Sequence, residues 1–130
     1  MDLIQIESRQ KPGCTIKIRK HELVCDLNAA DGGKDLGPSP AELLTASLGA
    51  CVVVMVAAYC RQHGYCDGPV AVSATYELGG DPKTIRAITM DLEIPRDVPE
   101  EKKEAVRRLV EKCPIKQTLA CPPQIDLEIR

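Results

Sequence analysis

Residues 39–64 have the sequence SPAELLTASLGACVVVMVAAYCRQHG. Ser39, Pro40 and Glu42 fit the N-cap, the first-turn proline and the capping-box acid that begin a helix. The glycine that closes this stretch fits a helix end, because glycine readily adopts the left-handed backbone that follows a last turn. These signals predict one long central helix, from Pro40 to about His63.

Most of this helix carries no charge. The eighteen residues from Leu43 to Cys60 are uncharged, and that length lies at the lower limit for crossing a membrane. Thr45, Ser47, Gly49 and four alanines lower the hydrophobicity of the run, so we expect no membrane partner. An apolar helix without a polar face is otherwise buried on all sides. In so short a chain, we expect a second subunit to complete that burial.

Three strands are expected before the central helix. Apolar residues and turn signals place them at Leu3–Ile6, Cys14–Arg19 and Leu23–Leu27, with a turn at Lys20–Glu22. The segment that follows, Asn28–Ser39, is rich in Gly, Asp and Pro and has no periodicity. It is therefore predicted to be a loop.

A hairpin, a second helix and a closing strand are expected after the central helix. The hairpin strands are Val70–Leu78 and Ile85–Ile94, around a turn formed by Gly79, Gly80, Asp81 and Pro82. Alternation of Ile125, Leu127 and Ile129 predicts the closing strand. The resulting order, β-β-β-α-β-β-α-β, indicates an α+β fold with mainly antiparallel pairing.

The second helix is predicted to begin near Asp97, with Glu100 as its capping partner. Its apolar positions form one inward face, made of Ala105, Val106, Leu109, Val110 and Cys113. Pro114 interrupts this helix and can begin a short helical turn through Leu119. Cys113 would then lie near the cap of that turn, facing free backbone N–H groups that favour a thiolate.

Composition limits the class of protein. A length of 130 residues indicates a single domain, residues 1–130. The net charge is −2 and both Trp and Phe are absent, so nucleic acid is not an expected partner. The N-terminus does not resemble a signal peptide. Seven cysteines, an odd number, suggest reduced thiols in a cytoplasmic protein.

Two cysteines are candidates for chemistry, although local sequence favours packing for each. Cys51 lies on a helical stripe made of Leu44, Leu48, Cys51, Met55 and Tyr59, and buried cysteine commonly acts as a small hydrophobe. Its position in mid-helix denies it the helix N-terminal dipole, so activation would need a cation or a donor. Arg19 and Lys34 are candidate cations, and both are most simply solvated charges. Cys14, Cys25 and Cys121 are most simply packing residues.

Cys60, His63 and Cys66 form a second group of soft ligands at the end of the central helix. Their spacing matches neither standard paired zinc motif, and no obvious fourth ligand follows. Gly64 would also break the helical phase between the second and third residues. We therefore predict neither a metal nor a cofactor.

Two segments resemble the signature of the OsmC/Ohr family. The first is GGKDLGPSPAELL at residues 32–44, followed by residues 46–51, and the second is EKCPI at residues 111–115. The resemblance implies an OsmC-like fold, in an intertwined homodimer with central helices packed between sheets. It also implies a reactive site at the subunit interface that uses Cys51 and Cys113.

In peroxidase members of the family, the cysteine that matches Cys51 attacks a hydroperoxide and becomes a sulfenic acid. The cysteine that matches Cys113 resolves it as a disulfide, and a dithiol reductant restores both thiols. The best-characterised peroxidases carry an acid where this chain has Ala41, so Glu42 is the candidate acid.

The chain has no arginine between His21 and Pro40, which leaves Arg19 or Arg9 as the candidate assisting arginine. This pattern is closer to the uncharacterised OsmC-like branch than to the organic hydroperoxide resistance branch. The resemblance implies a thiol-dependent peroxidase that reduces organic or inorganic hydroperoxides, and two alternatives to this function stay open. One is a non-enzymatic dimer that binds a small apolar or sulfur-containing ligand, with Cys51 as a pocket wall. The other is sulfur transfer through a Cys51 persulfide.

Overall fold

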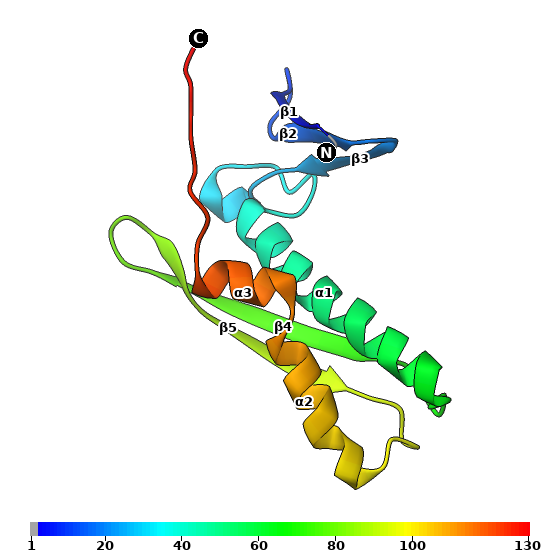
Figure 1. Ribbon diagram of the computed structural model, residues 1–130. Coiled ribbons are helices and arrows are strands. Elements are labelled where there is room, and N and C mark those ends of the chain that lie inside the picture. The colour runs from blue at the N-terminus through cyan, green and yellow to red at the C-terminus, as the bar shows by residue number, and fades with distance from the viewer. Residues whose placement is uncertain (1–2) are drawn as a thin grey trace. The chain divides into compact units, whose positions relative to one another are not determined.

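The structure, a computed structural model, describes residues 3–130 (Figure 1). Its elements, in chain order, are β1 (Ile4–Ser8), β2 (Cys14–Ile18), β3 (His21–Cys25), η1 (Ala29–Asp31), α1 (Pro40–His63), β4 (Ala71–Gly79), β5 (Thr84–Glu93), η2 (Glu100–Lys102), α2 (Lys103–Glu111) and α3 (Pro114–Ala120). All strand pairs are antiparallel. The α+β class and its antiparallel pairing are therefore confirmed.

The chain divides into two compact units, and the boundary falls after Leu44, within the first turns of α1. The first unit contains the three-stranded sheet and the loop that follows it. The second contains most of α1, the β4–β5 hairpin and the C-terminal helices.

The first unit is a meander in the order β1-β2-β3. The turn between β2 and β3 is at Arg19 and Lys20, so the predicted turn at Lys20–Glu22 was placed too late. Arg19 has a positive φ of 54°, which two-residue hairpin turns require. Arg19 is thus a turn residue at the tip of a hairpin.

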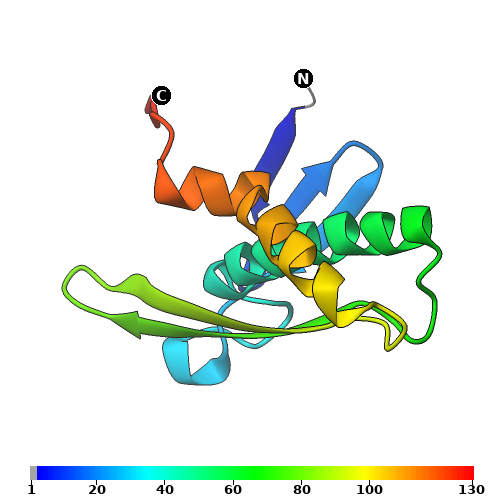
Figure 2. The ribbon, with the colours of Figure 1, turned by 60° about the horizontal axis from the view of Figure 1, so that its bottom comes forward.

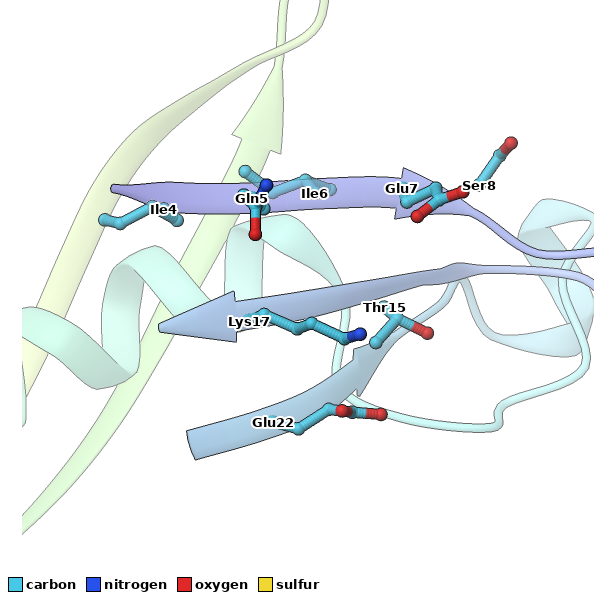
Figure 3. Close-up of a pocket in the computed structure, with 8 residues that line it drawn as sticks. All are labelled: Ile4, Gln5, Ile6, Glu7, Ser8, Thr15, Lys17 and Glu22. Carbon is cyan, nitrogen blue, oxygen red and sulfur yellow. The ribbon is translucent and has the colours of Figure 1, made fainter. Parts of the chain in front are cut away.

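The two faces of this sheet differ in polarity. Gln5, Lys17 and Glu22 lie opposite one another across the three strands, and Figure 3 shows them side by side on one face. This face contains a hollow of about 910 Å³. Because side chains alternate along a strand, the isoleucines of β1 and β2 share the other face with Cys14 and Cys25.

Asp26 organises the loop between β3 and α1. Its carboxylate accepts hydrogen bonds from the backbone N–H groups of Leu27 (2.7 Å), Lys34 (3.0 Å) and Leu36 (3.2 Å). Burial acts to raise the pKa of Asp26, but these three donors and the charge of Arg9 outweigh it and lower the pKa. The loop predicted from composition alone is therefore an ordered structure held by one carboxylate.

Two glycines let this loop pack closely on the end of β3. A Cβ at Gly33 would collide with the carbonyl oxygen of Leu27, and one at Gly37 with the carbonyl oxygen of Val24. Glycine has no side chain, so the backbones can approach. The Gly-rich motif at residues 32–37 thus has a structural explanation.

The second unit packs helices on one face of the β4–β5 hairpin (Figure 2). Val72 pairs with Leu92 and Tyr76 with Ile88 in the hairpin register. Side chains of this face contact a cluster of buried residues from α1, α2 and their connections, namely Leu48, Val52, Val56, Cys60, Val98, Val106 and Cys113. The core of this unit is therefore almost entirely aliphatic and thiol.

Only one side of α1 is covered within the chain. Its buried stripe consists of Thr45, Leu48, Gly49, Val52, Val56 and Cys60, which differs from the predicted stripe through Leu44 and Cys51. Leu44 is 39% exposed and Val54 is 66% exposed. The burial on all sides that the uncharged sequence suggests is thus not reached within one chain.

By length and composition alone, α1 could cross a membrane, and it is the one such helix among the described residues. The core helix of a soluble protein passes the same test. In this structure α1 supplies most of the buried cluster of its unit, which is the role of a core helix.

The start of the second helix differs from the prediction. Asp97 is not its cap, because the Asp97 carboxylate accepts the N–H groups of Cys66 (3.0 Å) and Asp67 (3.1 Å). The 3-10 turn η2 precedes α2, which begins at Lys103 without a side-chain cap. Asp97 therefore ties the segment after α1 to the segment before α2.

The closing strand is not formed. Residues 122–130 have no assigned strand, and Figure 1 shows the chain running away from α3 as an extended tail. Ile125, Leu127 and Ile129 are 85%, 83% and 90% exposed. The alternation is present in the sequence, but a strand also needs a neighbour with which to hydrogen-bond, and none of the described strands pairs with this segment.

Candidate functional site

Cys51 lies at the edge of the buried stripe of α1. One helical position further on, Val52 is 1% exposed, whereas Cys51 is only partly buried. The Cys51 Sγ lies 3.8 Å from the Sδ of Met55, one turn along the helix. Cys51 thus packs against the core, and part of its side chain remains accessible to a small molecule.

Cys113 lies at the N-cap of α3, directly after α2. Its backbone is fixed on both sides, because its N–H donates to the carbonyl of Val110 (3.1 Å) and its carbonyl accepts from Gln117 (3.0 Å). Pro114 occupies the first helical position, as predicted. The Cys113 side chain has no exposed surface.

The Cys51 and Cys113 thiols interact directly, with opposite effects on their pKa values. The interaction with Cys113 raises the pKa of the Cys51 thiol and burial raises it further, while the N–H of Ile115 opposes both. Burial acts to raise the pKa of Cys113, but the Cys51 S–H, the N–H groups of Lys116 and Ile115, and the charge of Lys116 lower it. Of the two thiols, Cys113 is therefore the one whose pKa is lowered, and Cys51 is the one whose pKa is raised.

This arrangement lets the two sulfurs share one proton. When Cys113 loses its proton, the Cys51 S–H can donate to the Cys113 thiolate, and transfer of that proton to Cys113 would leave the thiolate on Cys51. The thiolate is the nucleophilic form of cysteine. The pair thus supplies a nucleophile, a nearby proton acceptor and a second sulfur for disulfide formation.

An open groove of about 600 Å³ exposes Cys51 to solvent. Its other lining residues are Ser47, Ala50, Val54, Met55, Lys112 and Pro114. Apolar side chains dominate this lining, and Lys112 supplies the one basic group. The groove therefore suits a small molecule with an apolar body.

Glu42 and Arg19 are accounted for by their local structure. The Glu42 carboxylate accepts the Ser39 N–H (2.9 Å), and the Ser39 hydroxyl accepts the Glu42 N–H (3.2 Å). This reciprocal pair is the predicted capping box, and the Ser39 N–H lowers the pKa of Glu42. Arg19 occupies the exposed β2–β3 turn. Both belong to the first unit, and a role beside the thiols stays a prediction for each.

The group Cys60, His63 and Cys66 is dispersed. Cys60 is buried in the core, where burial and the charge of Asp97 raise the pKa of its thiol. The His63 Nδ1 lies 2.9 Å from the Tyr59 carbonyl oxygen, and Cys66 is exposed. Across residues 3–130, no cluster of three or more His, Cys, Asp or Glu side chains could hold a metal ion.

Sequence reasoning missed two contributors to the thiol pair. Met55 was assigned only to the apolar stripe, yet its sulfur contacts Cys51. Lys116 was not singled out, yet its N–H and its charge lower the pKa of Cys113. The signal for Lys116 was its place in the first turn after Pro114, where charge and free N–H groups act on a cap residue.

Most of this chain matches a known protein family. The model of the family described as OsmC-like protein matches residues 32–128. The chain belongs to the OsmC-like family. The match includes both segments on which the resemblance was based, and it contains both thiols of the pair. No curated protein gives a significant match.

Solved structures of OsmC-like and related proteins share the fold. A Psychrobacter arcticus protein, described as an osmotic stress induced and detoxification response protein, has a TM-score of 0.81 at 15% identity, covering 91% of this chain and 88% of that one. An OsmC-like protein from Mycoplasma pneumoniae has a TM-score of 0.77 at 18% identity, with coverages of 94% and 89%. The organic hydroperoxide resistance protein OhrB of Bacillus subtilis has a TM-score of 0.64 at 15% identity, with coverages of 94% and 92%.

Proposed function

We propose that this OsmC-like chain reduces hydroperoxides through Cys51 and Cys113. The observation that carries the proposal is the direct interaction of the two thiols, one of which borders an apolar groove. A buried cysteine that only fills space needs neither a second thiol nor an opening. The pair has both, together with pKa shifts in opposite directions on the two sulfurs.

Cys51 is the attacking residue in this proposal because it reaches the groove, while Cys113 has no exposed surface. The Cys51 thiolate attacks the outer oxygen of the hydroperoxide, the O–O bond breaks, and the alcohol leaves with one proton. Cys113 then attacks the Cys51 sulfenic acid, and water leaves as the disulfide forms. A dithiol reductant exchanges with this disulfide and restores both thiols.

The lining of the groove supports an organic hydroperoxide as the substrate. Val54 and Met55 offer apolar surface beside Cys51, and Lys112 offers a cation near the developing negative charge. The related Bacillus subtilis and Vibrio cholerae structures are of organic hydroperoxide resistance proteins, which is consistent with this choice. Hydrogen peroxide would gain less from the apolar contacts.

We propose that the working form is a homodimer. Val54 presents an exposed apolar side chain on α1, and Ile125, Leu127 and Ile129 present three more on the tail. A second copy of the chain would cover these surfaces, including the Val54 side of the groove.

The test uses fully reduced protein and one equivalent of cumene hydroperoxide. We expect loss of the hydroperoxide, and a Cys51–Cys113 disulfide detected by mass spectrometry of tryptic peptides. Cys51→Ser should abolish turnover, and Cys113→Ser should accumulate the sulfenic acid on Cys51, which a dimedone probe captures. If the hydroperoxide survives and both thiols stay free, the proposal fails.

A second candidate function is binding of a small apolar ligand without chemistry, and the apolar lining of the groove favours it. Cys51 would then be only part of the wall. In that case the parent chain would not consume hydroperoxide, and Cys51→Ser would keep its affinity for an apolar fluorescent probe. Sulfur transfer through a Cys51 persulfide would instead appear as a mass gain of one sulfur after incubation with a sulfane donor.

A further inference from the structure

A second pair of thiols lies in the first unit. Cys14 of β2 and Cys25 of β3 are directly opposite in the strand register. Residues opposite one another in an antiparallel pair lie on the same face, with Cβ atoms about 4.5–5.5 Å apart. The Cα atoms of such opposed residues lie about 4.5–5.5 Å apart, within the range of about 4.4–6.8 Å found for disulfide-bonded cysteines.

The two thiols differ in access. Cys25 is 5% exposed, whereas Cys14 is only partly buried. Both border an open hollow of about 500 Å³, together with Pro12, Gly13, Leu27 and Pro40. An incoming reagent would therefore meet Cys14 first, with Cys25 behind it.

The surroundings hold this pair in a fixed geometry. A Cβ at Gly13 would crowd the carbonyl oxygen of Cys25, and Asp26 anchors the loop that forms one wall of the hollow. The Asp26 N–H donates to the Pro38 carbonyl oxygen (3.1 Å). The two cysteines thus lie on paired strands, beside a loop that hydrogen bonds hold in place. This arrangement limits the backbone movement needed to form a disulfide.

The charge environment of this pair is opposite to that of Cys51 and Cys113. Burial raises the pKa of the Cys25 thiol, and Cys14, Asp26 and Glu42 raise it further. No cation appears among these causes. Stabilising the thiolate makes the corresponding disulfide easier to reduce. Where the thiolate is disfavoured, as at Cys25, the disulfide is harder to reduce.

We propose that Cys14 and Cys25 form a second redox dithiol, which closes to a cross-strand disulfide by exchange with a low-molecular-weight disulfide. This goes beyond the proposed hydroperoxide chemistry and does not depend on it. The Cys14 thiolate attacks one sulfur of the reagent, the S–S bond of the reagent breaks, and one thiol leaves. Cys25 loses its proton to solvent and attacks the Cys14 sulfur, which releases the second thiol. Two protein thiols are oxidised, and one disulfide is reduced.

Peptide mapping tests the proposal in the full chain. Reduced protein is equilibrated with oxidised glutathione, quenched with acid, alkylated and digested with trypsin. Cleavage after Arg9, Lys17, Lys20 and Lys34 separates QKPGCTIK, which contains Cys14, from HELVCDLNAADGGK, which contains Cys25. We expect these two peptides to be joined. The proposal is overturned if both cysteines are recovered in alkylated form while the chain stays folded, as judged by circular dichroism.

A Cys51→Ser/Cys113→Ser variant separates this inference from the proposed function. The Cys14–Cys25 link should form in it to the same extent as in the parent chain. If the link appears only when Cys51 and Cys113 are present, the Cys14–Cys25 pair is not an independent site and the inference fails. Hydroperoxide turnover by Cys14→Ser should equal that of the parent, whatever the fate of the second pair.

Single substitutions test the order of attack. In Cys25→Ser, the accessible Cys14 should trap glutathione as a stable mixed disulfide. In Cys14→Ser, the buried Cys25 should acquire glutathione at least about tenfold more slowly, because thiol exchange requires access. Equal rates for the two variants would refute Cys14 as the residue that reacts first.

Discussion

At the residue scale, the Cys51 and Cys113 thiols differ in the direction of their pKa shifts. Cys113 carries the lowered pKa although it is the more buried residue, because Cys51, Lys116 and the first N–H groups of α3 outweigh burial. Cys51 has the access and the raised pKa. Solvent access thus belongs to Cys51 and the lowered pKa to Cys113, and the interaction between the two thiols links these properties.

This difference predicts that removing either thiol shifts the pKa of the other, in opposite directions for the two cysteines. Cys51→Ala removes the S–H donor, so the pKa of Cys113 should rise. Cys113→Ala removes the thiol whose interaction raises the pKa of Cys51, so that pKa should fall. The pH dependence of iodoacetamide labelling measures both, with fragmentation of the tryptic peptide 35–61 to distinguish Cys51 from Cys60. Labelling profiles that do not move in either variant would show that the thiols are not coupled.

Asp26 gives the first unit a predictable response to acid. Its folded pKa lies below the ordinary value, which is about 3.9 in an unfolded chain. The unfolded chain therefore takes up the proton first as pH falls, and the stabilisation by this carboxylate is complete above about pH 4. It is lost as pH falls through the folded pKa.

Asp26→Asn tests this response. The amide places an NH₂ group where a carboxylate oxygen accepted a backbone N–H, so the variant should be less stable than the parent at neutral pH. The difference should shrink in acid, where the parent also loses its carboxylate. Urea unfolding at neutral pH and at about pH 3 measures both differences. A difference that stays constant across this range would contradict the assignment.

At the element scale, the capping box at the start of α1 separates a structural role of Glu42 from a chemical one. Ser39→Ala removes the hydroxyl that accepts the Glu42 N–H, and loss of such a cap costs about 1 kcal/mol. Glu42→Gln keeps a capping-box acceptor but removes the negative charge. We therefore expect Ser39→Ala to lower stability and Glu42→Gln to leave it nearly unchanged.

Hydroperoxide turnover in the same two variants tests the role that the family resemblance implies for Glu42. If the carboxylate assists the thiol chemistry, Glu42→Gln should lose turnover while Ser39→Ala keeps it at a temperature where both are folded. Urea unfolding provides the stability control. Full turnover in Glu42→Gln would leave the residue with its capping role alone.

At the scale of the whole molecule, the exposed apolar groups of α1 and the tail predict self-association. Replacing Ile125, Leu127 and Ile129 together with serine removes apolar surface that is 83–90% exposed in one chain. Such changes should barely affect an isolated chain. In the proposed dimer they should raise the dissociation constant at least tenfold, since about 1.4 kcal/mol of lost burial suffices.

Sedimentation velocity over a range of concentrations measures this dissociation. Val54→Glu provides an independent change on α1, and it should also weaken the dimer because it would bury a charge without a partner. A suitable control is Thr75→Ser, on the polar face of the hairpin. A parent chain that stays monomeric at high micromolar concentration would contradict the dimer.

The sequence by itself determined the local structure where short-range signals agree. Ser39, Pro40 and Glu42 specify the beginning of α1, and Pro114 specifies that of α3, because caps and prolines act within one turn. The family signature at residues 32–44, 46–51 and 111–115 predicted that the thiols of Cys51 and Cys113 form the site. Where a local signal was ambiguous, as at Asp97, the residue took partners that lie far away in the sequence.

Only the tertiary structure decided which thiols meet and how each is charged. Cys51 and Cys113 are separated by a hairpin and a helix, and Cys14 and Cys25 become partners only through strand register. The pKa of Cys51 depends on burial and on groups of other elements, namely Cys113 and the N–H of Ile115, whereas that of Cys113 also depends on its own chain neighbours Ile115 and Lys116. The tail shows the converse limit: its alternation predicts a strand, but strand formation also requires a pairing partner, and none of the described strands pairs with it.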